Sequence, residues 1–275
     1  MFCYKFFSPE EVIKNYLSEF SGNTQNKTHS SSIEYLQKVE TLRKSASSSL
    51  NLLDSHFLTF QHNQYYIENL IFNFLKLDKN WIVFTNEPTN SEFEKVNKIY
   101  NLDELQKKDK FKFEGKKILV WISKLSFFDK HLFRIIRELK KESLSPFYSY
   151  LSLNNFFYDF FENKEILKEI SFISFDPSVL FQEYGTHFFW FRKENLISPI
   201  FLGSNAVKKI GYNNQFFIKE FPHSLEIGTS NLISLIMLER FFYFLNKEGS
   251  KVLSNIFSKK LNFNFLSNFK ENNEH

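Results

Sequence analysis

Short apolar runs alternate with amphipathic segments through the middle of this chain, and this alternation limits the fold more than any other feature. Residues 117–123 (KILVWIS) form a continuous apolar run, which is typical of a strand buried on both faces. The segment 130–141 follows it with apolar residues at helical spacing, and the pair 64–77 and 81–85 shows a similar helix and strand in succession. Strands that alternate with helices predict an α/β fold with three layers and a mainly parallel sheet.

The same patterns divide the rest of the chain into expected elements. The expected strands are 56–60, 81–85, 117–123, 146–151, 170–175 and 187–192. The expected helices are 9–20, 33–49, 64–77, 130–141, 156–168 and 231–245, with Gly249 at the end of the last one. Residues 86–116 are weakly patterned and are predicted to form loops with one short helix. We therefore predict one large domain over residues 1–245 and a short, partly disordered C-terminal remnant over residues 246–275.

The composition argues against a nucleic-acid partner. The formal net charge is +4, from 35 Lys and Arg against 31 Asp and Glu, which is too mild for a nucleic-acid surface. The chain holds 37 Phe but only 7 Gly, and Lys, Asn and Ile are also abundant. This bias favours an AT-rich genome, with an aromatic surface for membrane or nucleic acid as the alternative. The aromatic residues are spread along the whole chain, which favours compositional drift of the genome together with a buried core.

Cysteine usage and hydropathy predict a cytoplasmic protein. Cys3 is the single cysteine, so an internal disulfide framework is excluded and a reducing compartment is expected. The first residues hold too short an apolar run for a signal peptide. The apolar stretch 231–245 contains Glu239 and Arg240, which favours a buried helix over a membrane span.

Common catalytic and metal motifs are absent from the sequence. The seven histidines form no pair at metal-ligand spacing, and the chain has no GxSxG, no phosphate-binding P-loop and no GxGxxG. Average usage of about 7% would give about 19 glycines in this length, so loops that cradle phosphate are also disfavoured. The tripeptide Asp176-Pro177-Ser178 is interpreted as a turn rather than as a catalytic acid and nucleophile.

One stretch, 221–241 (FPHSLEIGTSNLISLIMLERF), carries a more specific signal. A polar turn from Glu226 to Asn231 leads directly into an apolar helix, and its Thr, Ser and Asn are good N-caps at a potential anion site. The turn resembles that of class V aminotransferase-like enzymes, especially the cysteine desulfurases, which reads roughly phrFEaGTpN. The resemblance implies that Thr229 occupies the place of the threonine that reaches the cofactor phosphate of the partner subunit in a dimer.

Further segments match that family in the same order along the chain. Asn23, His29 and Arg43 lie at positions that match an N-terminal loop and the helix after it. The runs 117–123 and 173–175 resemble core strands, and 184–193 resembles a later strand of the family. The resemblance implies the fold of pyridoxal-phosphate-dependent transferases, represented by its large domain, with most of the small C-terminal domain missing.

The residues that hold and activate pyridoxal phosphate in the family are replaced here. The phosphate turn corresponds to His62-Asn63-Gln64, the aspartate that pairs with the ring nitrogen corresponds to Tyr150, and the Schiff-base lysine corresponds to Val179. Without that lysine no internal aldimine forms, and without the aspartate the ring is a weaker electron sink. A displaced lysine, Lys168, is the alternative. We predict no catalytic residue, no metal and no bound cofactor, and a vestigial pocket formed by Asn23, His29, His62, Asn63, Gln64, Tyr150, Val179 and Thr229.

These observations lead to three functional hypotheses. The first is an inactive desulfurase-like pseudoenzyme that acts through protein contacts, as a homodimer or as a partner of an active desulfurase or an iron–sulfur scaffold, without nucleic acid or membrane. The second is a small-molecule or phosphate binder, or a divergent enzyme, in which Asn23, His29 and Thr229 converge on an anion. The third is a lineage-specific α/β protein outside the family.

Overall fold

The protein is built on a seven-stranded sheet with helices on both faces. The computed structural model describes residues 30–105, 115–123, 128–143, 145–154, 157–178, 186–201, 206–210, 216–226 and 232–249. The strand order is β1-β7-β6-β5-β4-β2-β3. The strands are β1 (His56–Gln61), β2 (Trp81–Thr85), β3 (Lys98–Asn101), β4 (Lys117–Ile122), β5 (Phe147–Ser152), β6 (Phe172–Phe175) and β7 (His187–Arg192).

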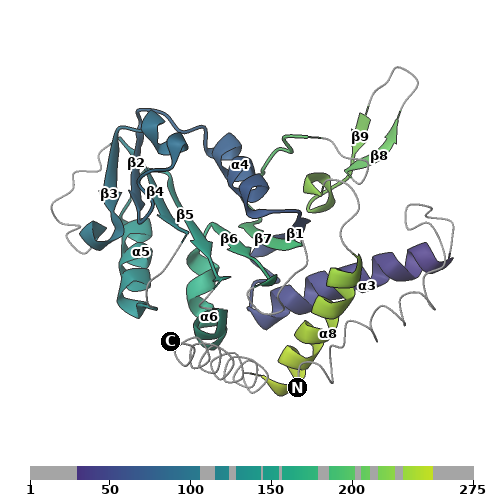
Figure 1. Ribbon diagram of the computed structural model, residues 1–275. Helices are drawn as coiled ribbons and strands as arrows, with labels where there is room; N and C mark the ends of the chain where they lie inside the picture. Colours follow the sequence, from purple (N-terminus) through teal and green to yellow (C-terminus); the bar gives the residue numbers. More distant parts are fainter. Residues whose placement is uncertain are drawn as a thin grey trace, which may run out of the picture.

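The sheet is mainly parallel, as the sequence predicts. Strands β3, β2, β4, β5 and β6 are parallel to their neighbours, whereas β7 is antiparallel to both β6 and β1. Strand β1 therefore runs in the same direction as β6. A separate ribbon of β8 (Val207–Ile210) and β9 (Phe216–Ile218) stands away from the main sheet (Figure 1).

The helices form two layers around this sheet (Figure 1). Helix α4 (Gln64–Leu75) covers one face, and its buried residues pack with those of 3₁₀ helix η1 (Ser91–Lys95). The other face is covered by α3 (Ser30–Ser49), α5 (Lys130–Glu142), α6 (Phe157–Glu162) and α8 (Leu232–Glu248), and α3 packs along α8. Two further 3₁₀ helices are η4 (Lys164–Glu169) and η5 (His223–Leu225). The result is a three-layer α/β architecture with a core on each side of the sheet.

Local sequence signals explain where the central helices begin and end. Asn63 caps α4 by accepting a 2.8 Å hydrogen bond from the Tyr66 amide, and Asp129 caps α5 by accepting one from the His131 amide. Gly249 follows α8 with φ of +65°, a left-handed conformation that glycine adopts without strain. The expected end of α8 at Gly249 is confirmed.

Three elements were not predicted from the sequence. Strand β3 lies at the sheet edge and is mostly exposed, so its sequence lacks the apolar run of a core strand. The ribbon strands β8 and β9 are similarly short, and β9 is exposed along its whole length. The expected helix at residues 9–20 and the expected tail at 250–275 lie outside the described residues. Within the part of the chain that the structure describes, no helix is long and apolar enough to cross a membrane.

Candidate functional site

The carboxyl ends of β1, β2, β4, β5 and β6 meet at one edge of the sheet, together with the start of β7. In α/β sheets of this kind, ligands bind outside the carboxyl ends of the strands. The site predicted from the sequence also maps here, since His62, Asn63 and Gln64 follow β1 and Tyr150 lies near the end of β5.

The two faces of the sheet differ sharply at this edge. Side chains alternate between the two faces along a strand, so the last two residues of each strand point to opposite faces of the sheet. The α4 face carries polar or hydrogen-bonding side chains: Gln61, Thr85, Trp121, Tyr150, Ser174 and His187. The opposite face carries Phe60, Phe84, Ile122, Leu151, Phe175 and Phe188. The candidate site therefore lies on the α4 face.

Tyr150 is the centre of this polar row. Its ring is fully buried and stacks on Trp121 at a centroid distance of 4.0 Å. Its hydroxyl lies 2.8 Å from Ser174 Oγ and accepts a hydrogen bond from Gln64 Nε2. Burial raises the pKa of Tyr150 far above its usual value, and the hydrogen bonds from Ser174 and Gln64 offset only part of this effect. The phenol is therefore neutral and held in place by two neighbours.

The three residues at the start of α4 divide into different roles. Gln64 reaches Tyr150 and also donates to Glu68 Oε1 at 3.0 Å, so the structure brings two of the predicted site residues together. Asn63 is engaged as the helix cap, and His62 is exposed. Asn23, His29, Val179 and Thr229 lie outside the described residues.

A second polar pair, Asp176 and His187, lies beside Tyr150 on the neighbouring strands. His187 Nε2 is 3.6 Å from Asp176 Oδ2, and the Ser178 amide donates to Asp176 Oδ1 at 2.9 Å. Burial opposes ionisation, but hydrogen bonds from His187 and Ser178 outweigh it and lower the pKa of Asp176 to about 2. Asp176 is therefore a carboxylate at neutral pH. The predicted turn at 176–178 holds a carboxylate–imidazole contact that sequence patterns did not reveal, because only the pairing of β6 with β7 brings His187 to it.

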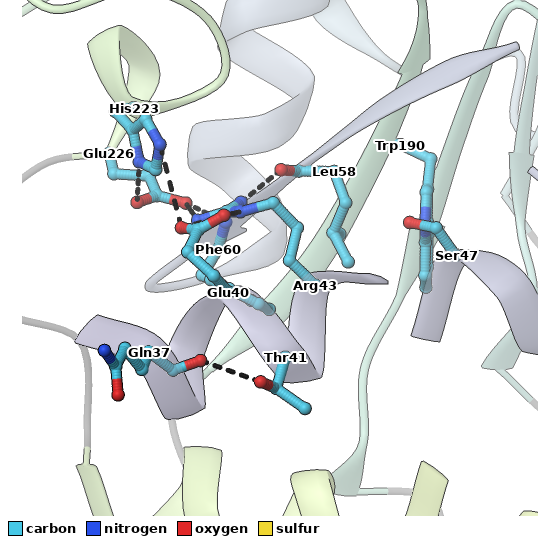
Figure 2. Close-up of polar contacts among 10 residues, drawn as sticks. All are labelled: Gln37, Glu40, Thr41, Arg43, Ser47, Leu58, Phe60, Trp190, His223 and Glu226. Atoms are coloured by element: carbon cyan, nitrogen blue, oxygen red, sulfur yellow. Dashed lines mark hydrogen bonds and ion pairs between the residues drawn. The ribbon is translucent and has the colours of Figure 1, made fainter. Parts of the chain in front are cut away.

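A buried ion pair joins two segments that the sequence comparison had singled out separately (Figure 2). Arg43 of α3 has Nη2 3.0 Å from Glu226 Oε1, and Glu226 Oε1 also accepts a 3.0 Å hydrogen bond from the Phe60 amide. Burial opposes the charge on Glu226, but Arg43 and His223 outweigh it and hold the pKa of Glu226 below its usual value. We call Arg43, Glu226, His223 and Glu40 the Arg43 cluster. It fixes residues 221–226 to α3 and β1.

The lysines that bracket the replaced Schiff-base position lie at the other edge of the sheet. Lys168 precedes β6 and has Nζ 3.1 Å from Glu165 Oε2. Lys193 follows the antiparallel strand β7 and donates to the Leu53 carbonyl at 3.0 Å. The sequence has no lysine between these two positions. The start of β6 and the end of β7 share the amino edge of the parallel strands, and both ammonium groups are engaged there, with Glu165 and with the Leu53 carbonyl.

Comparison with solved structures decides the fold. The cysteine desulfurase CsdA from Escherichia coli matches with a TM-score of 0.65 and 15% identity, over 86% of this chain and 64% of that one. The cysteine desulfurase from Thermococcus onnurineus NA1 matches with a TM-score of 0.64 and 16% identity, over 88% and 65%. The chain has the fold of the cysteine desulfurases. It spans about two thirds of the length of these two proteins.

The desulfurase fold extends over nearly the whole chain in a third comparison. The NifS-like protein from Rickettsia africae matches over 96% of this chain and 72% of that one, with a TM-score of 0.63 and 16% identity. No protein-family profile matches the chain, and no curated protein matches it in sequence. Similarity at this identity shows the fold, while the chemistry depends on the residues of the site.

The described residues of this desulfurase fold do not fit pyridoxal phosphate. Tyr150, which the sequence predicts at the place of the ring-pairing aspartate, presents a neutral phenol whose hydroxyl is already bonded to Gln64 and Ser174. Asn63, at the expected phosphate turn, uses its side-chain oxygen to cap α4. The ring nitrogen and the phosphate of the cofactor thus meet no suitable partner among these residues.

Proposed function

We propose that this protein is a catalytically inactive, desulfurase-like pseudoenzyme that acts through protein contacts. It forms a homodimer or pairs with an active cysteine desulfurase or an iron–sulfur scaffold protein. The observation that carries the proposal is the fixed, neutral phenol of Tyr150, which by resemblance corresponds to the carboxylate that pairs with the ring nitrogen in the family. The retained three-layer fold around it supports a role for the folded surface rather than for cofactor chemistry.

The loss of aldimine chemistry follows from charge and reach. A neutral phenol cannot stabilise a protonated ring nitrogen as a carboxylate does. Lys168 and Lys193 lie at the opposite edge of the sheet, so they do not supply a Schiff-base nitrogen at this site. Among the described residues, neither Tyr150 nor these two lysines thus supplies the carboxylate and the Schiff-base nitrogen that sulfur release by the family's chemistry requires.

The contact role is supported by the Arg43 cluster. The segment that ends at Glu226 leads directly into the turn 227–231, which by resemblance faces the partner subunit in the family. Arg43 and the Phe60 amide hold Glu226 although neither touches the candidate site. A buried ion pair is costly to retain unless the geometry that it fixes is useful. The protein thus keeps the support of a dimer surface.

Cofactor binding is tested by titrating the purified chain with pyridoxal phosphate. The aldimine absorption band is followed, the mixture is reduced with borohydride, and the intact mass is measured, with an active cysteine desulfurase as the positive control. We expect no band and no adduct. A stable adduct at one lysine would show that the chain keeps Schiff-base chemistry and would overturn the pseudoenzyme assignment.

The contact role is tested separately by size-exclusion chromatography with light scattering. The chain is measured alone and mixed with an active cysteine desulfurase or an iron–sulfur scaffold protein. We expect a dimer or a mixed complex. A strict monomer in every mixture contradicts the contact role while leaving the loss of the cofactor intact.

A second candidate function is the binding of a small molecule at the same edge of the sheet. The specific observation in its favour is a group of buried polar atoms on the α4 face that have no hydrogen-bond partner, including Gln61 Oε1, Gln64 Oε1 and His187 Nδ1. This candidate does not exclude protein contacts, although the site adjoins residues 221–226, since Gln61 Nε2 donates to the Leu225 carbonyl at 3.2 Å.

A further inference from the structure

Unpartnered polar atoms are concentrated at the carboxyl edge of the α4 face. Among the described residues, the buried atoms without a hydrogen-bond partner at this edge are Gln61 Oε1, Gln64 Oε1, His187 Nδ1, Trp121 Nε1, Ser123 Oγ and Ser152 Oγ. Gln61 is only 2% exposed and Ser152 only 6%. Buried polar groups nearly always have partners, so such a concentration calls for water or a ligand at this edge.

These atoms belong to one continuous row of side chains. Gln61 of β1 is the register partner of His187 on β7, and His187 contacts Asp176 at the end of β6. Two residues earlier on β6, Ser174 bonds the hydroxyl of Tyr150, which accepts from Gln64 of α4. The row therefore runs from β1 to β5, and α4 lies over it.

Of these six unpartnered atoms, three are acceptors, two are hydroxyls, and Trp121 Nε1 can only donate. The two amide oxygens, Gln61 Oε1 and Gln64 Oε1, have no hydrogen to donate. His187 places Nε2 toward the Asp176 carboxylate, so the ring hydrogen is engaged there and Nδ1 is left as an acceptor in neutral imidazole. The hydroxyls of Ser123 and Ser152 adapt to either role. A ligand that fits this row is rich in hydrogen-bond donors.

The fixed charges at this edge are negative. Asp176 ends β6 and Glu87 follows β2, while Glu68 lies one turn into α4 beside Gln64. Both Glu68 and Glu87 lie close enough to oppose ionisation of Tyr150. Among the described residues that follow the carboxyl ends of β2, β4, β5 and β6, namely 86–90, 123, 153–154 and 176–178, none is a lysine or an arginine. The charges thus favour a cation over a phosphate.

We infer that this edge binds a small aliphatic amine as its ammonium ion, with the Asp176 carboxylate as the counter-ion and with Gln61, Gln64 and His187 as acceptors for its hydrogens. The site takes a ligand of the opposite charge to the phosphate of pyridoxal phosphate. The inference rests on the proposed loss of that cofactor from the same edge.

The test uses three five-carbon probes that differ only in their end groups: cadaverine, 1,5-pentanediol and glutarate. Their effects on the thermal midpoint of the whole chain are compared over a concentration series, and the affinity of cadaverine is then measured by calorimetry. We expect a saturable rise in the midpoint with cadaverine, little effect of the diol, and none of glutarate or inorganic phosphate. Stabilisation by glutarate or phosphate instead would overturn the assignment of charge.

Two variants locate the site. Asp176→Asn keeps the size of the side chain but removes the charge, and we expect the affinity for cadaverine to fall about 10- to 100-fold, as for the loss of a charge-assisted hydrogen bond. Glu94→Gln removes one exposed carboxylate far from this edge and is expected to change the affinity less than about twofold. Equal affinities for the wild type and Asp176→Asn would show only non-specific attraction to an acidic surface. If Asp176→Asn does not fold, histidine-selective NMR of the wild type gives the answer, since cadaverine must shift the His187 ring signals.

A parallel titration with pyridoxal phosphate separates the two proposals. Specific binding of pyridoxal phosphate without binding of cadaverine would overturn both the loss of the cofactor and the amine site. Binding of neither would overturn the amine site alone and would leave ordered water as the partner of the buried atoms.

Discussion

At the scale of single residues, Tyr150 shows how one replacement changes what a site can do. Its phenol, predicted at the place of a carboxylate, remains neutral and bonds Ser174 Oγ and Gln64 Nε2 with the same oxygen. Its ring fills space against Trp121 at 4.0 Å. A residue with these contacts stabilises the edge of the sheet instead of activating a cofactor. Tyr150 therefore makes a measurable contribution to folding.

We predict that Tyr150→Phe destabilises the protein by about 1–3 kcal/mol, because it leaves the buried Gln64 and Ser174 side chains without their shared partner. The ring and its packing are preserved, so the loss reports the hydrogen bonds. Urea unfolding followed by circular dichroism gives the free energy of unfolding. Tyr65→Phe is the matched control, since Tyr65 is 79% exposed and is expected to have little effect. Equal stabilities of the wild type and Tyr150→Phe would contradict the structural role.

The carboxylate of Asp176 adds a pH dependence that can be isolated by a difference measurement. Its pKa in the folded protein is about 2, below the value of about 3.9 in an unfolded chain. A depressed pKa stabilises the folded state above the unfolded value, and this contribution is lost as the pH falls from about 4 toward about 2. We predict that the stability difference between the wild type and Asp176→Asn shrinks over this range. Urea unfolding at several pH values measures it, and a difference independent of pH would show that the carboxylate is not stabilised by folding.

At the scale of elements, the Arg43 cluster connects α3, β1 and the segment before the turn 227–231. Arg43 also donates to the Leu58 carbonyl and lies over the Phe60 ring at 4.7 Å, so one side chain holds two neighbouring residues of β1. Two segments that are more than 180 residues apart in the sequence thus share one buried ion pair (Figure 2). The free energy of unfolding is expected to change differently when one partner of such a pair is lost and when both are lost.

We predict that Arg43→Met destabilises the protein by about 3–5 kcal/mol, because Glu226 is left as a buried charge without its counter-ion. The double variant Arg43→Met with Glu226→Leu removes both charges and is expected to recover much of this loss. Chemical denaturation of the two single variants and the double variant completes a double-mutant cycle. Additive losses in the double variant would mean that the two side chains do not interact energetically.

The elements also show which parts of the structure follow from local sequence. The strand KILVWIS and helix α5 have strong periodic patterns and clear caps, and the structure confirms both. Strand β3 and the ribbon were not predicted, because exposed edge strands lack a buried face to produce a pattern. The contact between Gln64 and Tyr150 depends on the strand order, and the pair Asp176–His187 on an antiparallel register, neither of which is written in local sequence.

At the scale of the whole molecule, 37 phenylalanines serve two different environments. Many pack in the two cores, as Phe189 does on strand β7 with no exposed surface. Others lie on the β8–β9 ribbon (Figure 1), where Phe216 is 54% exposed and Phe217 is 43% exposed. Only the rings in the first environment are removed from water, so only they contribute substantially to stability.

We predict a clear separation between the two classes when phenylalanine is truncated to alanine. Phe189→Ala removes a ring from a close-packed core and is expected to lower the free energy of unfolding by about 3–5 kcal/mol. Phe216→Ala removes an exposed ring from a ribbon outside the main sheet, and the expected change is within about 0.5 kcal/mol. Both values come from urea unfolding under the same conditions, so each variant is the control for the other. A loss at Phe216 that approaches the loss at Phe189 would mean that the ribbon is covered in solution, and the oligomeric state of the chain would then have to include a contact through β9.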